Sequence, residues 1–253
     1  MTHSSTPDII AEWLRALEAR HLADLRVPEV TRALRALSSA YVERRHKVAS
    51  GSTLDSAGKR AAFALFYAPL HFLATQHVVE ALDAVRAAPS SILDLGCGTG
   101  AAGAAWAIAR GGTPAVTGID RHPWAVQEAK WTYRALGLRG YARQGDLSRM
   151  PRAPQGSAIV AAYLLNEIPD AARQSLEDQL FVAASSGVRL LVLEPIARSI
   201  APWWDRTADR FRSIGGRAEE WRFPVDLPPL LRTLDHAAGL NHRELKLRTI
   251  YVA

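Results

Sequence analysis

The sequence predicts an α/β protein in which a mainly parallel sheet, covered by helices on both faces, follows a helical N-terminal region. From residue 90 onward, short apolar segments alternate with segments of helical spacing, a pattern typical of parallel strands linked by helices. Before residue 88, apolar residues recur three and four positions apart, as on one face of a helix. We therefore expect a helical cap or substrate region at residues 1–87 and an α/β domain at residues 88–253.

The N-terminal region contains two ranges of helical spacing, 8–47 and 56–87, joined by the small residues of 49–53. Such a run of small residues is typical of a linker. Proline lacks an amide hydrogen and disturbs the helix in which it lies. We therefore expect Pro28 to separate two helices and Pro69 to bend the second range.

The α/β domain divides into elements of ordinary length. Strands are expected at 91–95, 115–119, 140–144, 157–163 and 188–194, with two more near 219–225 and 242–252. Helices are expected at 101–110, 123–136, 170–184, about 199–214 and 228–238. The last strand alternates apolar and polar residues and follows a short helix.

The composition excludes several classes of protein. The chain has 253 residues, of which 48% are hydrophobic and only one, Cys97, is a cysteine. An intrachain disulfide or a cysteine metal cluster cannot form, and we expect no metal. The first residues lack the pattern of a secretory signal, and the apolar run 61–74 is interrupted and too short to span a bilayer. We expect a cytoplasmic protein without a membrane partner; its oligomeric state is not indicated.

The net charge of +6 permits two interpretations. A basic surface is typical of proteins that bind nucleic acid. Only four of the 31 basic residues are lysines, and an arginine- and alanine-rich composition is equally typical of a GC-rich genome. RNA as a partner and a purely compositional charge both remain open.

The stretch SILDLGCGTG at 91–100 carries the first functional signal. A strand runs into Asp94, and Gly96, Gly98 and Gly100 follow on alternate positions. Glycines after a first strand suit any ligand that presses against the strand-to-helix turn. The carboxylate of Asp94 would repel a pyrophosphate, whereas it would attract an ammonium and a sulfonium. The loop therefore favours S-adenosylmethionine over NAD.

Two further acids follow at matching positions. Asp120 ends the second strand, where a carboxylate can accept both ribose hydroxyls of an adenosine. Asp146 and Leu147 follow the third strand, where an acid can accept from the adenine amino group and an apolar neighbour can cover the ring. Arg121 and His122 come next to the ribose acid and could cover the adenine, or lie exposed in a loop.

With these motifs, residues 88–253 resemble a class I S-adenosylmethionine-dependent methyltransferase. The resemblance implies a Rossmann-like seven-stranded sheet whose final strand is antiparallel. It also implies that Asp94, Gly96, Gly98 and Gly100 line the methionine end of S-adenosylmethionine, that Asp120 lies at the ribose, and that Asp146 and Leu147 lie at the adenine.

The end of the fourth strand is where this fold presents the acceptor, and here it contains Asn166 and Glu167. Asn166 could orient an amine or hydroxyl and Glu167 could accept its proton; alternatively the pair forms a turn and a helix start. Methyltransferases of base amino groups often carry Asn/Asp-Pro-Pro-aromatic here, and only Asn166 matches. Tyr163 is expected in the core.

Three other groups of side chains have two interpretations each. Glu194 and Pro195 end the fifth strand and could shape a pocket rim. Trp203 and Trp204, beside arginines, could stack on a base or pack on the N-terminal helices. Tyr67 and His71 share one helix face and could touch ligand or have structural roles.

A weaker resemblance connects the chain with the mitochondrial small-ribosomal-subunit methyltransferase-like family. It rests on Tyr41-x-x-Arg44 and on Leu165-Asn-Glu167, and implies a ribosomal subunit as partner, although the cysteines of that family's iron–sulfur cluster are missing. The predicted function is therefore methyl transfer to RNA, ribosomal RNA first. A small-molecule acceptor and a non-catalytic ribosome-assembly factor are the alternatives.

Overall fold

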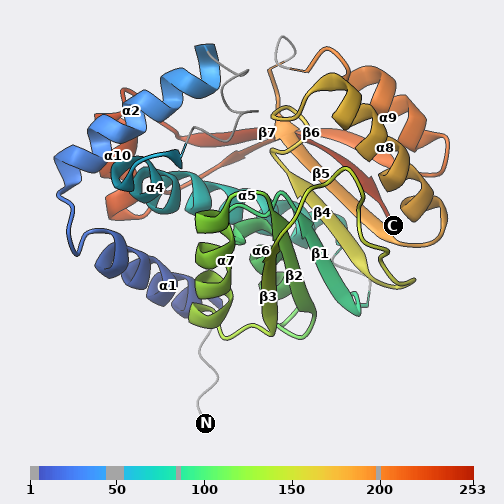
Figure 1. The fold of residues 1–253 in the computed structure, drawn as a ribbon, viewed down its shortest axis with the longest axis horizontal. Coiled ribbons are helices and arrows are strands. Elements are labelled where there is room, and N and C mark those ends of the chain that lie inside the picture. The colour runs from blue at the N-terminus through green and yellow to red at the C-terminus, as the bar shows by residue number, and fades with distance from the viewer. Residues whose placement is uncertain (1–5, 44–53, 84–86, 198–200) are drawn as a thin grey trace.

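The computed structural model describes residues 6–43, 54–83, 87–197 and 201–253. Its centre is a seven-stranded sheet covered by helices, and the N-terminal helices lie beside one end of that sheet (Figure 1). The predicted α/β fold, Rossmann-like with a helical N-terminal region, is confirmed.

The strands have the order β3-β2-β1-β4-β5-β7-β6. Their bounds are β1 Ser91–Leu95, β2 Ala115–Asp120, β3 Gly140–Gln144, β4 Ala158–Ala162, β5 Arg189–Pro195, β6 Arg217–Pro224 and β7 Glu244–Val252. Strands β1 to β5 are parallel, and β7 is antiparallel to both β5 and β6. The carboxyl ends of β1, β2 and β4 therefore meet at one edge, where ligands bind in open parallel sheets.

The strands bury side chains on both faces. Along β1, Ile92 belongs to a core cluster with the α5 and α6 side, whereas Leu93 belongs to the α8 and α9 side. The helices are α6 Ala101–Ala109, α7 Pro123–Ala135, α8 Asp170–Ser185, α9 Trp204–Arg212 and α10 Pro229–Ala237. This two-sided burial explains why β1, β4 and β5 are nearly continuous apolar runs in the sequence.

The N-terminal region forms α1 Thr6–His21, α2 Val27–Glu43, α4 Ala57–Ala62, the π-helical segment η2 Phe63–Tyr67 and α5 Ala68–Asp83. The prediction that Pro28 separates two helices needs a correction, because α2 begins at Val27 and Pro28 lies in its first turn, a position that needs no amide hydrogen. The expected linker 49–53 lies outside the described residues.

Pro69 disturbs the second helix just before its own position. Since Pro69 has no amide hydrogen, the carbonyl of Leu65 cannot accept the usual bond from the residue four positions on. The amide of Ala68 instead donates to the carbonyl of Phe63, five positions back. This single wide turn is the η2 segment, and such segments are often found at functional sites.

The N-terminal helices pack against the α/β domain. The buried Glu128 of α7 accepts hydrogen bonds from Arg20 (3.1 Å) and pairs with His21 (2.8 Å), both at the end of α1. By length and composition one helical stretch, Ala57–Leu82, could cross a membrane, but 67% of its apolar window is buried inside the protein. Such burial is typical of a core helix. The division at residue 87 stays a prediction.

Candidate functional site

A cavity of about 790 Å³ lies at the carboxyl edge of the sheet. The loops after β1, β2, β3 and β4 and the end of β5 line it, and η2 and α5 close one side. Of the predicted site residues, Asp94, Gly96, Gly98, Asp120, Arg121, Asp146, Leu147, Asn166 and Glu167 line this cavity. The fold therefore brings together most of the residues that the sequence predicted to bind a ligand.

The glycine loop has the left-handed backbone that its residue types predict. Gly96, Gly98 and Gly100 have φ of 60°, 51° and 79°, a region that glycine enters without steric penalty. Gly100 does not line the cavity. A Cβ at Gly100 would lie 2.7 Å from Cε1 of Tyr133, so this glycine allows α6 to begin against the Tyr133 ring rather than facing a ligand.

Asp94 lies beneath the loop and is buried. Its Oδ2 accepts the amide hydrogen of Gly103 at 2.9 Å, near the start of α6. Burial raises the pKa of Asp94 to about 7, the negative charge of Asp120 adds to the rise, and the Gly103 amide opposes it. A positively charged ligand would lower this pKa and stabilise the ionised carboxylate.

Asp120 ties the second strand to the glycine loop. Its Oδ2 accepts from the amide of Gly98 at 2.9 Å, and its Oδ1 accepts from the amide of His122 at 2.8 Å. Each carboxylate oxygen retains a second lone pair for a ligand hydroxyl. Asp146 is exposed, lines the cavity and accepts from the amide of Ser148 at 2.9 Å.

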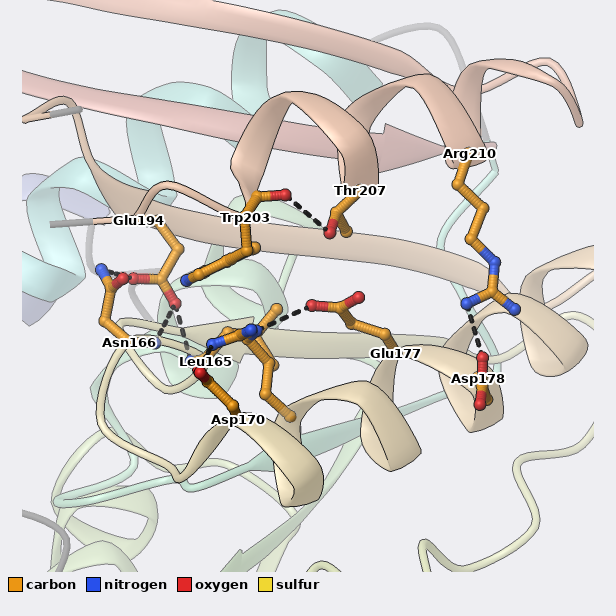
Figure 2. A network of polar contacts seen from close by, with 10 residues as sticks. Leu165, Asn166, Asp170, Glu177, Asp178, Glu194, Trp203, Thr207 and Arg210 are labelled. Atoms are coloured by element: carbon orange, nitrogen blue, oxygen red, sulfur yellow. Dashed lines mark hydrogen bonds and ion pairs between the residues drawn. The ribbon is translucent and has the colours of Figure 1, made fainter. Parts of the chain in front are cut away.

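At the end of β4, Asn166 is held by an acid from the neighbouring strand. Glu194 is fully buried; its Oε1 accepts from the amide of Leu165 at 2.7 Å and its Oε2 accepts from the side-chain amide of Asn166 (Figure 2). The Oδ1 of Asn166 is buried without a hydrogen-bond partner among the described residues. A buried acceptor without a donor is costly, so this oxygen calls for a ligand that donates a hydrogen bond.

Glu167 lies next to Asn166 on the same wall. Burial raises the pKa of Glu167 to about 8, and the charge of Asp120 adds to the rise while Arg121 opposes it. Burial likewise raises the pKa of Glu194 to about 8, against the effect of its amide donors. Carboxyl groups poised near neutral pH are typical of proton-transfer sites.

Another part of the cavity wall is aromatic, and sequence reasoning missed half of it. Phe63, Tyr67, His71 and Tyr163 all line the cavity. The expectation that Tyr163 is a core residue is wrong, because its ring lies in the cavity wall and stacks on His71 with centroids 4.1 Å apart. Tyr163 is also the one described non-glycine residue with positive φ, 56°. Ligand contact and a structural role were both open for Tyr67 and His71, and both residues line this cavity.

The tryptophans after β5 are buried instead of exposed. Trp203 and Trp204 are 7% and 6% exposed. The guanidinium of Arg173 lies 5.0 Å from the Trp203 ring and that of Arg248 lies 4.4 Å from the Trp204 ring. Figure 2 shows Trp203 directed toward this network of α8 and α9. Neither stacking on a base nor packing on the N-terminal helices fits this position.

The charges of the cavity fit S-adenosylmethionine. The charge of Asp120 raises the pKa of both Asp94 and Glu167, and Arg121 is the one lysine or arginine among the described lining residues. A ligand with a sulfonium and an ammonium relieves this repulsion. Among the described residues, no group of three or more His, Cys, Asp or Glu side chains could hold a metal ion.

Comparison with known proteins leads to the same cofactor. Residues 92–186, from the glycine loop through α8, match the family described as methyltransferase domain. The chain carries a class I S-adenosylmethionine-dependent methyltransferase domain. It is thus an enzyme that uses S-adenosylmethionine, which supplies a methyl group activated by positively charged sulfur. No curated protein sequence matches the chain significantly.

Solved structures similar to this chain include two methyltransferases. The structure of mitomycin 7-O-methyltransferase is 16% identical in sequence to this chain. The match covers 99% of this chain and 76% of the mitomycin 7-O-methyltransferase chain, with a TM-score of 0.50. Magnesium protoporphyrin IX methyltransferase from Synechocystis with bound S-adenosylmethionine is 16% identical in sequence to this chain. The match covers 71% of this chain and 79% of the Synechocystis chain, with a TM-score of 0.45. The first of these extends the shared fold over the N-terminal helices.

Proposed function

We propose that this methyltransferase acts on a small molecule whose nitrogen or oxygen nucleophile carries a hydrogen. The observation that carries the proposal is the buried Oδ1 of Asn166, which lacks a donor in the described structure. An N–H or O–H of the acceptor would supply that donor. Glu194 would hold the amide of Asn166 in this orientation through its own hydrogen bond.

Glu167 is proposed as the proton acceptor. It lies one residue from Asn166 on the cavity wall, and its ionised form is the conjugate base of a group with a pKa of about 8. A base matched to neutral pH accelerates reactions by about 10²–10⁴-fold. Asn166 would orient the nucleophile, and Glu167 would remove its proton.

The shape and charge of the cavity support a small acceptor. A volume of about 790 Å³ is within the range of roughly 300–1,000 Å³ for small-ligand sites. The lining acids would repel the phosphates of a nucleic acid. Ribosomal RNA in the cytoplasm remains the alternative, supported by the net charge of +6; only a flipped-out base could reach this cavity.

The test is radiolabelled methyl transfer from S-adenosylmethionine into a metabolite extract, total RNA and ribosomal subunits in parallel. We expect label in the metabolite fraction. Asn166→Ala and Glu167→Gln should lose most of this transfer while binding S-adenosylhomocysteine within a few-fold of the parent. Glu80→Gln, at an exposed position of α5, is the matched control. Label confined to RNA would contradict the proposal.

A further inference from the structure

Four rings form one continuous wall of the cavity. The centroids of Phe63 and Tyr67 lie 5.9 Å apart, those of Tyr67 and His71 6.2 Å, and those of His71 and Tyr163 4.1 Å. Tyr67 is held from behind, because its hydroxyl shares a 3.0 Å hydrogen bond with that of Ser38 on α2. The rings therefore come from residues 63–71 and from Tyr163, and α2 supports them from a third part of the chain.

The π-helical segment aligns three of these rings. In a regular α-helix of about 3.6 residues per turn, side chains four positions apart drift by roughly 40°, so Phe63 and His71 would diverge by roughly 80°. The wider turn of η2 rotates less per residue. The rotation of the side-chain direction from Phe63 to Tyr67 is thus opposite in sign to the rotation from Tyr67 to His71. The two rotations partly cancel, and all three rings reach the cavity.

The wall carries no positive charge. Burial lowers the pKa of His71 to about 3, so its ring is neutral at physiological pH. Asn166, Glu167 and Glu194 line the same cavity and bring acceptor oxygens into the space that the rings line. Aromatic faces and carboxylates that line one cavity form the arrangement that recognises organic cations, since ring faces and carboxylates both attract positive charge.

We propose that the acceptor is an aliphatic amine and that its nitrogen binds as an organic ammonium cation between the aromatic wall (Phe63, Tyr67, His71 and Tyr163) and Glu167. This rests on the proposed function and narrows its substrate class. The bound ammonium donates to the Oδ1 of Asn166 and transfers one proton to the carboxylate of Glu167. The nitrogen lone pair becomes free, and the methylated product is again a cation that suits the same wall.

The test compares two probes of equal shape that differ in charge. Choline and its neutral carbon isostere 3,3-dimethylbutan-1-ol are titrated by calorimetry into the full chain saturated with S-adenosylhomocysteine. We expect choline to bind at least tenfold more tightly, which corresponds to about 1.4 kcal/mol. Equal binding of the two probes, or no choline binding, overturns the inference.

Variants show whether the wall is responsible. Tyr67→Leu and Glu167→Gln should each weaken choline binding by about five- to tenfold, whereas Tyr67→Phe keeps the ring and should stay within twofold. Tyr141→Leu is the matched control, since Tyr141 is 56% exposed on β3. Unchanged choline affinity in Glu167→Gln and Tyr67→Leu overturns the inference; if Tyr67→Leu does not fold, Glu167→Gln decides.

Failure of the ammonium proposal and failure of the proposed small-molecule function give different experimental results. Binding of S-adenosylhomocysteine together with label transfer to a neutral alcohol or an aromatic hydroxyl would leave a small-molecule methyltransferase but exclude the ammonium acceptor. Failure to transfer label to any metabolite, with choline preference intact, would contradict the proposed small-molecule function while leaving the cation site.

Discussion

Replacing Asp120 with alanine tests the loop geometry and the cofactor site together. The carboxylate accepts from the amides of Gly98 at 2.9 Å and His122 at 2.8 Å. A hydrogen bond to a charged group contributes about 1.5–3 kcal/mol, so two contribute about 3–6 kcal/mol. The charge of Asp120 also raises the pKa of Asp94 and Glu167, so its removal relieves repulsion. We expect a net loss of about 2–4 kcal/mol in unfolding free energy.

Cofactor affinity should fall in addition. If each ribose hydroxyl donates to this carboxylate, the loss is about 1.5–3 kcal/mol per bond, which is tenfold or more at roughly 1.4 kcal/mol per decade. Urea denaturation measures the stability, and calorimetric titration with S-adenosylhomocysteine measures the affinity. Asp226→Ala is the matched control, because Asp226 is 95% exposed and its carboxylate forms a surface ion pair with Arg232; its effect should stay below about 1 kcal/mol.

Two results would refute this reasoning in different ways. If folded Asp120→Ala binds S-adenosylhomocysteine within twofold of the parent, the carboxylate serves the loop alone and the ribose has other partners. If stability is unchanged, the two amide hydrogen bonds contribute far less than their geometry indicates.

Three further predictions concern single positions. The rate of methyl transfer should rise with pH toward about 8, where Glu167 ionises, and a pH–rate profile of Glu167→Gln should lack this rise. By urea denaturation, Gly100→Ala should lose about 1–3 kcal/mol more than Gly111→Ala, because both have positive φ but only a Cβ at Gly100 meets Tyr133. The lowered pKa of His71 contributes stability that is present above pH 6.5 and is lost as the pH falls toward 3; His71→Phe should therefore lose less stability over this range.

Local sequence signals predicted the sheet well. The expected strand at 140–144 coincides with β3, and that at 91–95 coincides with β1. β1 is buried on both faces, so an apolar run marks it directly. β3 is largely exposed, and Gly140 and Gly145 mark its two ends instead. The glycine loop was equally legible, since positive φ at alternate positions restricts the residue type to glycine.

The aromatic wall and the Glu194–Asn166 bond could not be predicted in the same way. Phe63 has an ordinary helical spacing, and the η2 turn together with the non-local packing of α5 on the domain brings its ring to the cavity. Glu194 was expected at a pocket rim, but its bond to Asn166 depends on β4 and β5 being neighbours in the sheet. The tryptophans after β5 were misjudged because sequence spacing does not reveal which face of the sheet receives them.

The electrostatics of the cavity connects the cofactor site with the acceptor site. Burial raises the pKa of Asp94, Glu167 and Glu194 to between about 7 and 8, so each carboxyl needs a neighbouring positive charge to ionise near neutral pH. S-adenosylmethionine brings two such charges, whereas its demethylated product retains only the ammonium. Transfer to an amine moves the lost positive charge from sulfur to the acceptor nitrogen, where the aromatic wall can stabilise it. The same acidic cavity therefore favours the methyl donor over its product and favours an acceptor that becomes a cation.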